Sequence, residues 1–173
     1  MTIAMQPIYT QTIGASPVSF ISFNNIPQTF TDLKIVISGR MNSAYVGVEF
    51  YVLPNTDTSA IYSSTWLYGY PTGSQSSGRQ SNVTYTPTQN ATAANATANT
   101  FGNAEIYFPN YTGSNFKSYI ADSVSPTNGT TGANVEIAAG LYRSTNPITN
   151  LYIPATGSWV QYSTFTLYGI TKG

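Results

Sequence analysis

The sequence predicts an all-β protein, built as a two-sheet antiparallel, jelly-roll-like sandwich of about eight or nine strands. Residues that favour strands, such as Val, Ile, Tyr, Phe and Thr, are abundant along the 173 residues. Gly, Pro, Asn and Ser, which favour turns, interrupt them at short intervals. No segment keeps the hydrophobic period of a helix for long. An immunoglobulin-like sandwich is the main alternative, and it is disfavoured because the chain has no cysteine for the usual Cys…Trp…Cys core.

The clearest strand is predicted at 32–38. Leu33, Ile35 and Ile37 share one face and Lys34 lies on the other, which is the period-2 pattern of a strand with one buried side. Similar segments, each bounded by turn residues, give the full set of predicted strands: 18–23, 32–38, 46–52, 61–70, 105–108, 117–124, 135–142, 148–153 and 159–168.

The segment 135–142 shows a further alternation of apolar and polar residues. Val135 and Ile137 belong to its apolar face and are expected to point into the core. Glu136 is then expected to point outward, as is Glu49 in an earlier strand.

The predicted strands belong to a single sandwich domain at 17–173, a common size for one domain. An N-terminal arm at 1–16 precedes it, because this stretch shows no clear alternation. A long polar loop is expected at about 71–102, where the low-complexity run NATAANATANT favours disorder.

The charged residues are few and exclude several classes of function. Six Lys and Arg residues balance six Asp and Glu residues, so the formal net charge is zero, and the basic residues are spread along the chain. We therefore do not expect nucleic acid as a partner, because binding it needs a basic patch. The chain has neither His nor Cys, which removes the usual zinc ligands and nucleophile systems. We expect no metal and no cofactor.

Enzyme activity is also not expected. A glycosidase would need two carboxylates on either side of the scissile bond. Structural roles at turns, strand starts or outward strand faces account for the candidates Asp32, Glu49, Asp57, Glu105, Asp122 and Glu136.

Aromatic residues are the one group that suggests a binding surface. Tyr62, Trp66, Tyr68 and Tyr70 share one side of the segment 61–70. Such a row can stack on a carbohydrate or anchor a subunit contact. Ordinary sheet packing or burial against another subunit is the favoured interpretation, because half-buried strand faces are where aromatics normally lie.

Three segments resemble a family of small virion-associated β-sandwich proteins of tailed bacteriophages, including cyanophages. They are NIPQTFTDLKIVISGR at 25–40, NTFGNAEIYFPNYTGSNFKSY at 99–119 and WVQYSTFTLYGI at 159–170. The resemblance implies a phage particle, a jelly-roll-type sandwich and a trimer. It carries no catalytic motif, and it leaves the choice between head and tail open.

We therefore expect a non-enzymatic capsid decoration (cement) protein that forms a homotrimer on the virion surface and contacts the major capsid protein or other virion proteins. The alternatives are a tail fibre or adhesin module that binds a host surface carbohydrate or receptor, and a cell-encoded lectin-like protein. No secretory signal and no apolar run of roughly 18 residues is present, so synthesis in the host cytoplasm without membrane insertion is expected.

The arm is the expected shell contact, because its apolar side chains would otherwise lie in water. Deletion of 1–14 is then expected to leave the sandwich folded. With the aromatic row, the predicted interface residues are Ile3, Met5, Ile8, Tyr9, Ile13, Tyr62, Trp66, Tyr68 and Tyr70.

Overall fold

The computed structural model describes residues 4–70, 72–86, 89–127 and 134–172. In these ranges the chain forms strands and no helix, and every pairing between neighbouring strands is antiparallel. The predicted all-β antiparallel sandwich is confirmed. The strands are β1 (Ala4–Thr12), β2 (Val18–Phe23), β3 (Asp32–Gly39), β4 (Gly47–Phe50), β5 (Leu53–Pro54), β6 (Tyr62–Gly69), β7 (Gln75–Val83), β8 (Gln89–Thr92), β9 (Gly102–Phe108), β10 (Lys117–Ser125), β11 (Asn134–Tyr142), β12 (Leu151–Trp159) and β13 (Thr164–Thr171).

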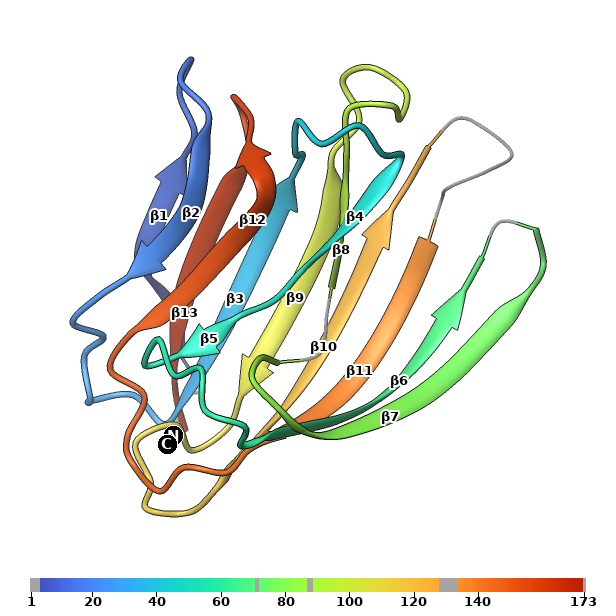
Figure 1. The fold of residues 1–173 in the computed structure, drawn as a ribbon. Coiled ribbons are helices and arrows are strands. Elements are labelled where there is room, and N and C mark those ends of the chain that lie inside the picture. The colour runs from blue at the N-terminus through green and yellow to red at the C-terminus, as the bar shows by residue number, and fades with distance from the viewer. Residues whose placement is uncertain (1–3, 71, 87–88, 128–133, 173) are drawn as a thin grey trace.

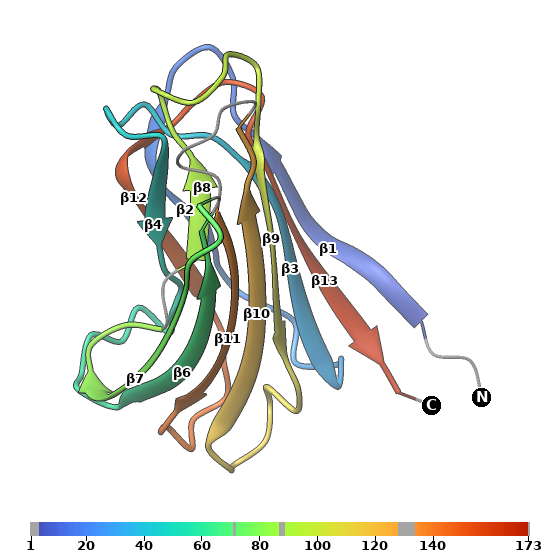
Figure 2. The same cartoon turned by 90° about the vertical axis from the view of Figure 1, so that its right-hand side faces the viewer.

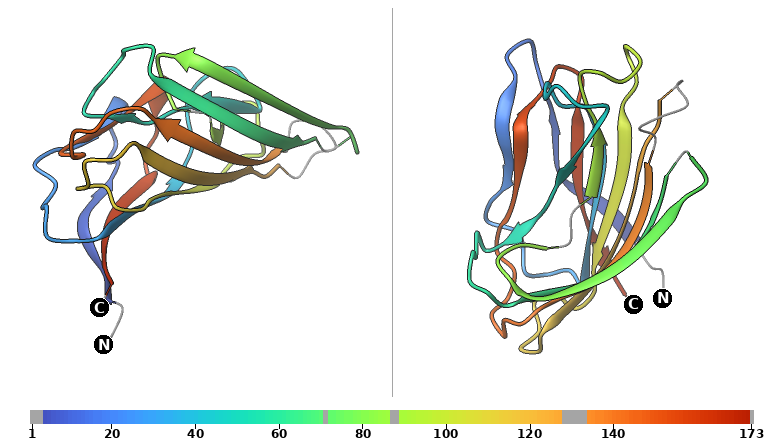
Figure 3. Two further views of the ribbon diagram at one scale, coloured as in Figure 1. Left: turned by 90° about the horizontal axis from the view of Figure 1, so that it is seen from below. Right: turned by 45° about the vertical axis from the view of Figure 1, so that its right-hand side comes forward.

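The strands make two layers (Figures 1 and 2). One layer is an eight-stranded sheet in the order β1-β13-β3-β9-β10-β11-β6-β7. The other layer consists of a three-stranded sheet, β2-β12-β5, and a two-stranded sheet, β4-β8. The second layer is the narrower one, and β6 and β7 extend past it (Figures 1 and 3).

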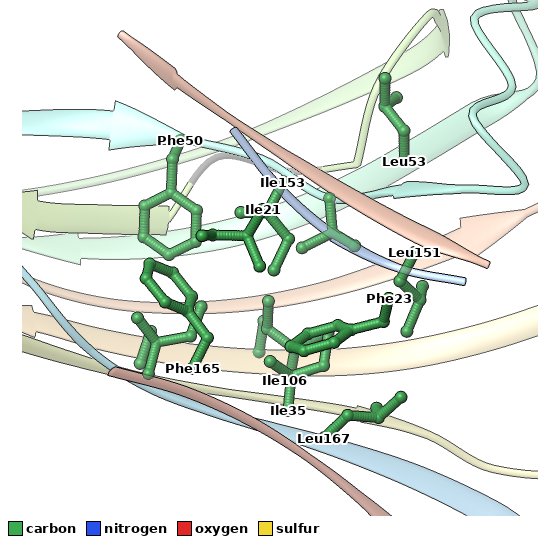
Figure 4. Close-up of a cluster of buried hydrophobic side chains, with 14 of the residues drawn as sticks. Ile21, Phe23, Ile35, Phe50, Leu53, Ile106, Leu151, Ile153, Phe165 and Leu167 are labelled. Carbon is green, nitrogen blue, oxygen red and sulfur yellow. The ribbon is translucent and has the colours of Figure 1, made fainter. Parts of the chain in front are cut away.

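The hydrophobic core lies between the two layers (Figure 4). Ile35, on the predicted buried face of β3, contributes to it and is fully buried. The indole of Trp159 packs edge-on between Phe50 and Phe165, with ring centroids 5.3 Å and 4.8 Å away. Edge-to-face packing of this kind adds to the stabilisation from burial alone. The core therefore joins β3 and β13 of the large sheet to β4 and β12 of the second layer.

The predicted N-terminal arm is wrong for residues 4–12, because these residues form β1. This strand pairs with β13 along its length, from Ala4 opposite Thr171 to Thr12 opposite Thr164. Sequence alternation does not reveal it, since β1 is an edge strand whose residues are nearly all exposed on both faces, and its register shifts after Pro7. Deletion of 1–14 would therefore expose the edge of β13 instead of removing a free segment.

The predicted long loop is also wrong in part, because β7 and β8 lie within 71–102. The Ser- and Gln-rich β7 has no hydrophobic pattern because it is the outermost strand next to β6. The small side chain of Ala91 lets β8 pack inside the fold, where its four residues are all buried. The guanidinium of Arg40 then holds the following turn by donating hydrogen bonds to the backbone carbonyls of Ala94, Ala96, Thr97 and Thr100.

Several strand boundaries differ from the prediction, and two of the differences change which strand a residue belongs to. Leu53 and Pro54 form the short strand β5, which pairs with β12 at the edge of its sheet, a position where a proline is tolerated. Trp159 ends β12 and does not begin the last strand, which starts at Thr164 after a turn.

Two phenylalanines test where the core lies. Phe165 is fully buried, whereas Phe116 is 53% exposed in the segment before β10. We expect Phe165→Ala to lower the free energy of unfolding by about 3–5 kcal/mol, because it leaves a cavity in the core. Phe116→Ala should change it by no more than about 0.5 kcal/mol. Urea unfolding followed by circular dichroism measures both, and equal losses would contradict this position of the core.

Candidate functional site

The strand β11 is turned the opposite way from the prediction. Glu136 is 2% exposed and faces the interior, whereas Val135 and Ile137 are each 52% exposed on the outer face. The expected orientation of β11 is therefore wrong. Alternation shows that two faces differ, but it does not show which face another layer will cover.

The inward orientation of Glu136 follows from what covers the inner face of the sheet at β11. Over β3 and β9 the inner face of the sheet is apolar and buried by the second layer, as Ile35 and Ile106 show. Over parts of β10 and β11 the cover is instead β8, most of whose residues are polar, and the inner face there carries the buried polar side chains of Ser123 and Glu136.

Strand register aligns these polar side chains in a row. Ser123 lies opposite Glu136, Glu136 opposite Tyr68, and Tyr68 opposite Ser76, across β10, β11, β6 and β7. Asn90 of β8 reaches over this row. Its backbone N–H donates to Ser123 Oγ (3.0 Å), its Nδ2 donates to Glu136 Oε2 (2.7 Å), and its Oδ1 accepts from the Tyr68 hydroxyl (3.2 Å). Asn90 thus forms hydrogen bonds with three side chains of the row at once.

The carboxyl group of Glu136 has no cationic partner in the described part of the chain, where the two ion pairs are Lys34–Glu105 and Lys172–Asp32. Burial raises the pKa of Glu136 to about 7, against the effect of the Asn90 hydrogen bond, and the negative charge of Glu49 contributes to the rise. Near neutral pH this side chain therefore takes up and releases a proton.

A pocket of about 240 Å³ lies beside this row. Its walls come from β4, β6, β7 and β11 and from the residues that follow β6 and β7. The lining residues are Glu49, Trp66, Tyr68, Tyr70, Ser76, Gln80, Tyr85 and Glu136.

The indole of Trp66 is positioned in this pocket by a glycine. Trp66 pairs with Gly78 across β6 and β7, and a Cβ atom at position 78 would come within 2.5 Å of the indole ring. The ring therefore lies against the backbone of β7, where only glycine leaves enough room. Further along the same face, the ring centroids of Tyr68 and Tyr70 are 4.6 Å apart.

The predicted aromatic row divides into two parts. Trp66, Tyr68 and Tyr70 line the pocket. Tyr62 is fully buried instead, stacks on Tyr142 with a centroid distance of 5.1 Å, and donates a hydrogen bond to the backbone carbonyl of Asp57.

The predicted interface residues near the N-terminus lie in different environments. Met5 is exposed, Ile8 packs against the core and Ile13 is buried in it. The Tyr9 hydroxyl donates to the backbone carbonyl of Asn24. Ile3 lies outside the described residues.

The outer face of the same strands carries an apolar patch. Leu67 lies directly opposite Ile137, and Val124 lies directly opposite Val135. Ile120 lies on the same face of β10, with the exposed Asp122 between it and Val124. All of these side chains are at least one third exposed. This outer patch (Leu67, Ile120, Val124, Val135 and Ile137) lies on the opposite side of the sheet from the pocket.

The remaining buried charges have structural roles. The ammonium of Lys117 donates to the backbone carbonyls of Gly113 (2.6 Å), Ser144 (3.2 Å) and Asn146 (2.7 Å), and so joins two loops. Asp32 accepts from the backbone N–H of Asn110 and pairs with Lys172. Over the described ranges, no three acidic side chains gather as a metal site, and no helix could span a membrane.

Neither a protein-family model nor a curated protein sequence matches this chain. Function is therefore inferred from the pocket and the outer patch themselves.

Sequence reasoning found the aromatic half of the pocket and missed its polar half. Ser76 and Gln80 lie in the expected loop, and Glu136 was expected on the outer face. The sequence of β10 contains a signal for this polar inner face. Ser123 and Ser125 make one face of β10 polar, whereas Ile120 and Val124 make the other face apolar.

The raised pKa of Glu136 predicts a pH-dependent stability. The folded protein binds the proton more tightly than the unfolded chain, whose pKa is near 4.5, so the free energy of unfolding falls as the pH rises from about 4.5 to about 7. Glu136→Gln keeps an acceptor for Asn90 and removes the charge. At about pH 8 we expect this variant to be more stable than the wild type by on the order of 3 kcal/mol.

Urea unfolding over a range of pH measures this effect. The advantage of Glu136→Gln should disappear near pH 4, where the wild-type carboxyl group is protonated in both states. Glu49→Gln is the matched control, because Glu49 is exposed and its substitution should leave the pH dependence largely intact. Parallel curves for wild type and Glu136→Gln would contradict a buried, protonatable Glu136.

Proposed function

We propose that this chain is a non-enzymatic structural subunit that associates with copies of itself through the outer patch. The observation that carries the proposal is the patch, with Leu67, Val135 and Ile137 each more than half exposed on neighbouring strands. A soluble monomer rarely leaves a contiguous apolar surface in water, and such surfaces commonly mark protein contacts.

Two further features support a second copy as the partner. The formal net charge is zero, so copies do not repel one another. The patch also adjoins β7, an outermost strand that carries Arg79 as its one charged residue and no proline. Edge strands are usually protected by charge or proline, and the opposite edge, β1, has Pro7 and a shift in register. The open edge of β7 therefore suits a subunit contact.

We assign the oligomer, a homotrimer, to the head of a tailed phage as a decoration protein. The three segments with the phage resemblance supply β3, β9 and β13, which are neighbours in the large sheet. The support for the virion role is thus this likeness in the core strands. A tail adhesin is the second candidate, and the aromatic pocket is the observation that favours it.

The oligomer can be tested in solution. Light scattering of the purified protein at micromolar concentration should give three times the chain mass of 18.6 kDa. Ile137→Glu should shift the mass to that of the monomer, because association would bury a charge without a partner. Ser19→Glu, which introduces the same charge at an exposed position near the start of β2, should leave the trimer intact. A wild-type protein that stays monomeric would contradict association through this patch.

The virion role needs a test on particles. A decoration protein binds the assembled shell and not free subunits, so its binding free energy adds to the stability of the shell. Particles that lack the protein should release DNA at a lower temperature, while the survivors adsorb to host cells normally. Lost adsorption with normal shell stability would overturn decoration in favour of the adhesin.

A further inference from the structure

We propose that the pocket between β6, β7 and β4 binds one neutral pyranose ring of a glycan. This site lies on the opposite side of the sheet from the outer patch, so it does not depend on the proposed assembly role.

The size of the pocket suits a single ring. Its volume of about 240 Å³ is below the roughly 300 Å³ at which sites for drug-sized ligands begin. An extended oligosaccharide could reach solvent from this pocket, but only one of its units would fit inside.

The lining combines an aromatic platform with many hydrogen-bonding groups. Trp66 offers a ring held in place by Gly78, and the C–H groups of a pyranose can pack on such a ring while its hydroxyls turn to the sides. Gln80 and Ser76 on one side and Glu49 on the other supply amide, hydroxyl and carboxylate groups. A polyhydroxylated ligand can use these donors and acceptors together.

The charges of the lining select a neutral sugar. The lining includes the exposed acidic side chain of Glu49 and has no Lys or Arg, so phosphates, sialic acids and uronic acids would meet repulsion. An aromatic site with two carboxylates could also suit a quaternary ammonium ion. Such a site would need Glu136 charged, whereas its burial raises its pKa to about 7 and leaves it partly protonated at neutral pH. A protonated carboxyl group can donate to a hydroxyl and gives little attraction to a cation.

Tryptophan fluorescence provides a direct readout. The chain has two tryptophans, and Trp159 is fully buried in the core, so a change caused by a ligand in the pocket would come from Trp66. The probes are the methyl pyranosides of glucose, galactose, mannose and N-acetylglucosamine, with glucuronate as the anionic probe and choline as the cationic probe. We expect at least one neutral pyranoside to bind with a dissociation constant of about 0.1–10 mM.

Variants of the full chain assign the binding to the pocket. Trp66→Ala should weaken binding by roughly tenfold or more, measured by calorimetry because it removes the reporter. Gln80→Ala, which keeps the reporter, should also weaken it. Thr65→Ala is the matched control, since Thr65 is the neighbour of Trp66 on the outer face and should leave affinity unchanged.

Three results would overturn the proposal: no response to any neutral pyranoside up to about 50 mM, tighter binding of choline or glucuronate, or equal losses in Thr65→Ala and Gln80→Ala. Ile137→Glu distinguishes this proposal from the assembly role. It should remove the trimer and leave pyranoside affinity per chain unchanged, so either proposal can fail without the other.

Discussion

The rest of this structure depends on the unequal width of its two layers. The eight-stranded sheet is covered by the second layer over β13, β3 and β9, and not over β6 and β7. Where it is covered, the inner face must be apolar, because exclusion of water from Ile35 and Phe165 supplies the main stabilisation of the fold. Over β10 and β11 the cover is the largely polar strand β8, and there the inner face accommodates Glu136 and the polar row. The pocket therefore lies where the hydrophobic core ends.

Strand alternation then places two unlike surfaces on the same strands. In β6, Trp66 and Tyr68 face the pocket and Leu67 between them faces outward. Any change of register that improved one surface would disrupt the other, because a shift of one residue exchanges the faces. Asn90 secures the register from the inside, since its hydrogen bonds need Glu136 and Tyr68 at neighbouring positions in one row. The inner polar network therefore also holds the outer patch in place.

The sequence predicted the parts of the fold in which local pattern and burial agree. The predicted bounds of β2 match the structure, and the prediction for β3 differs by one residue. In β3 the apolar Leu33 and Ile35 alternate with the polar Lys34, and the apolar face is the one that the second layer covers. The prediction failed for β1 and β7, whose residues are largely exposed on both faces, so that no alternation marks them. It also failed for Glu136, because which face of a strand is covered depends on distant segments such as β8. Half of the pocket depends on that long-range contact, and so only its aromatic half was predictable.

The two surfaces lie on opposite sides of β6 and β11, and this has a consequence for how they could work together. Association through the outer patch would leave the pocket of each subunit open, since Ile137 and Glu136 face opposite ways. A trimer formed through the patch would therefore display three pockets at fixed spacing. A pocket for a single ring gives only weak affinity, but three such sites on one rigid body engage a surface of repeated glycans with much higher avidity. In such an arrangement, a subunit that assembles through the outer patch would also be a multivalent glycan binder. The decoration and adhesin roles use different surfaces of the subunit, so one role does not exclude the other.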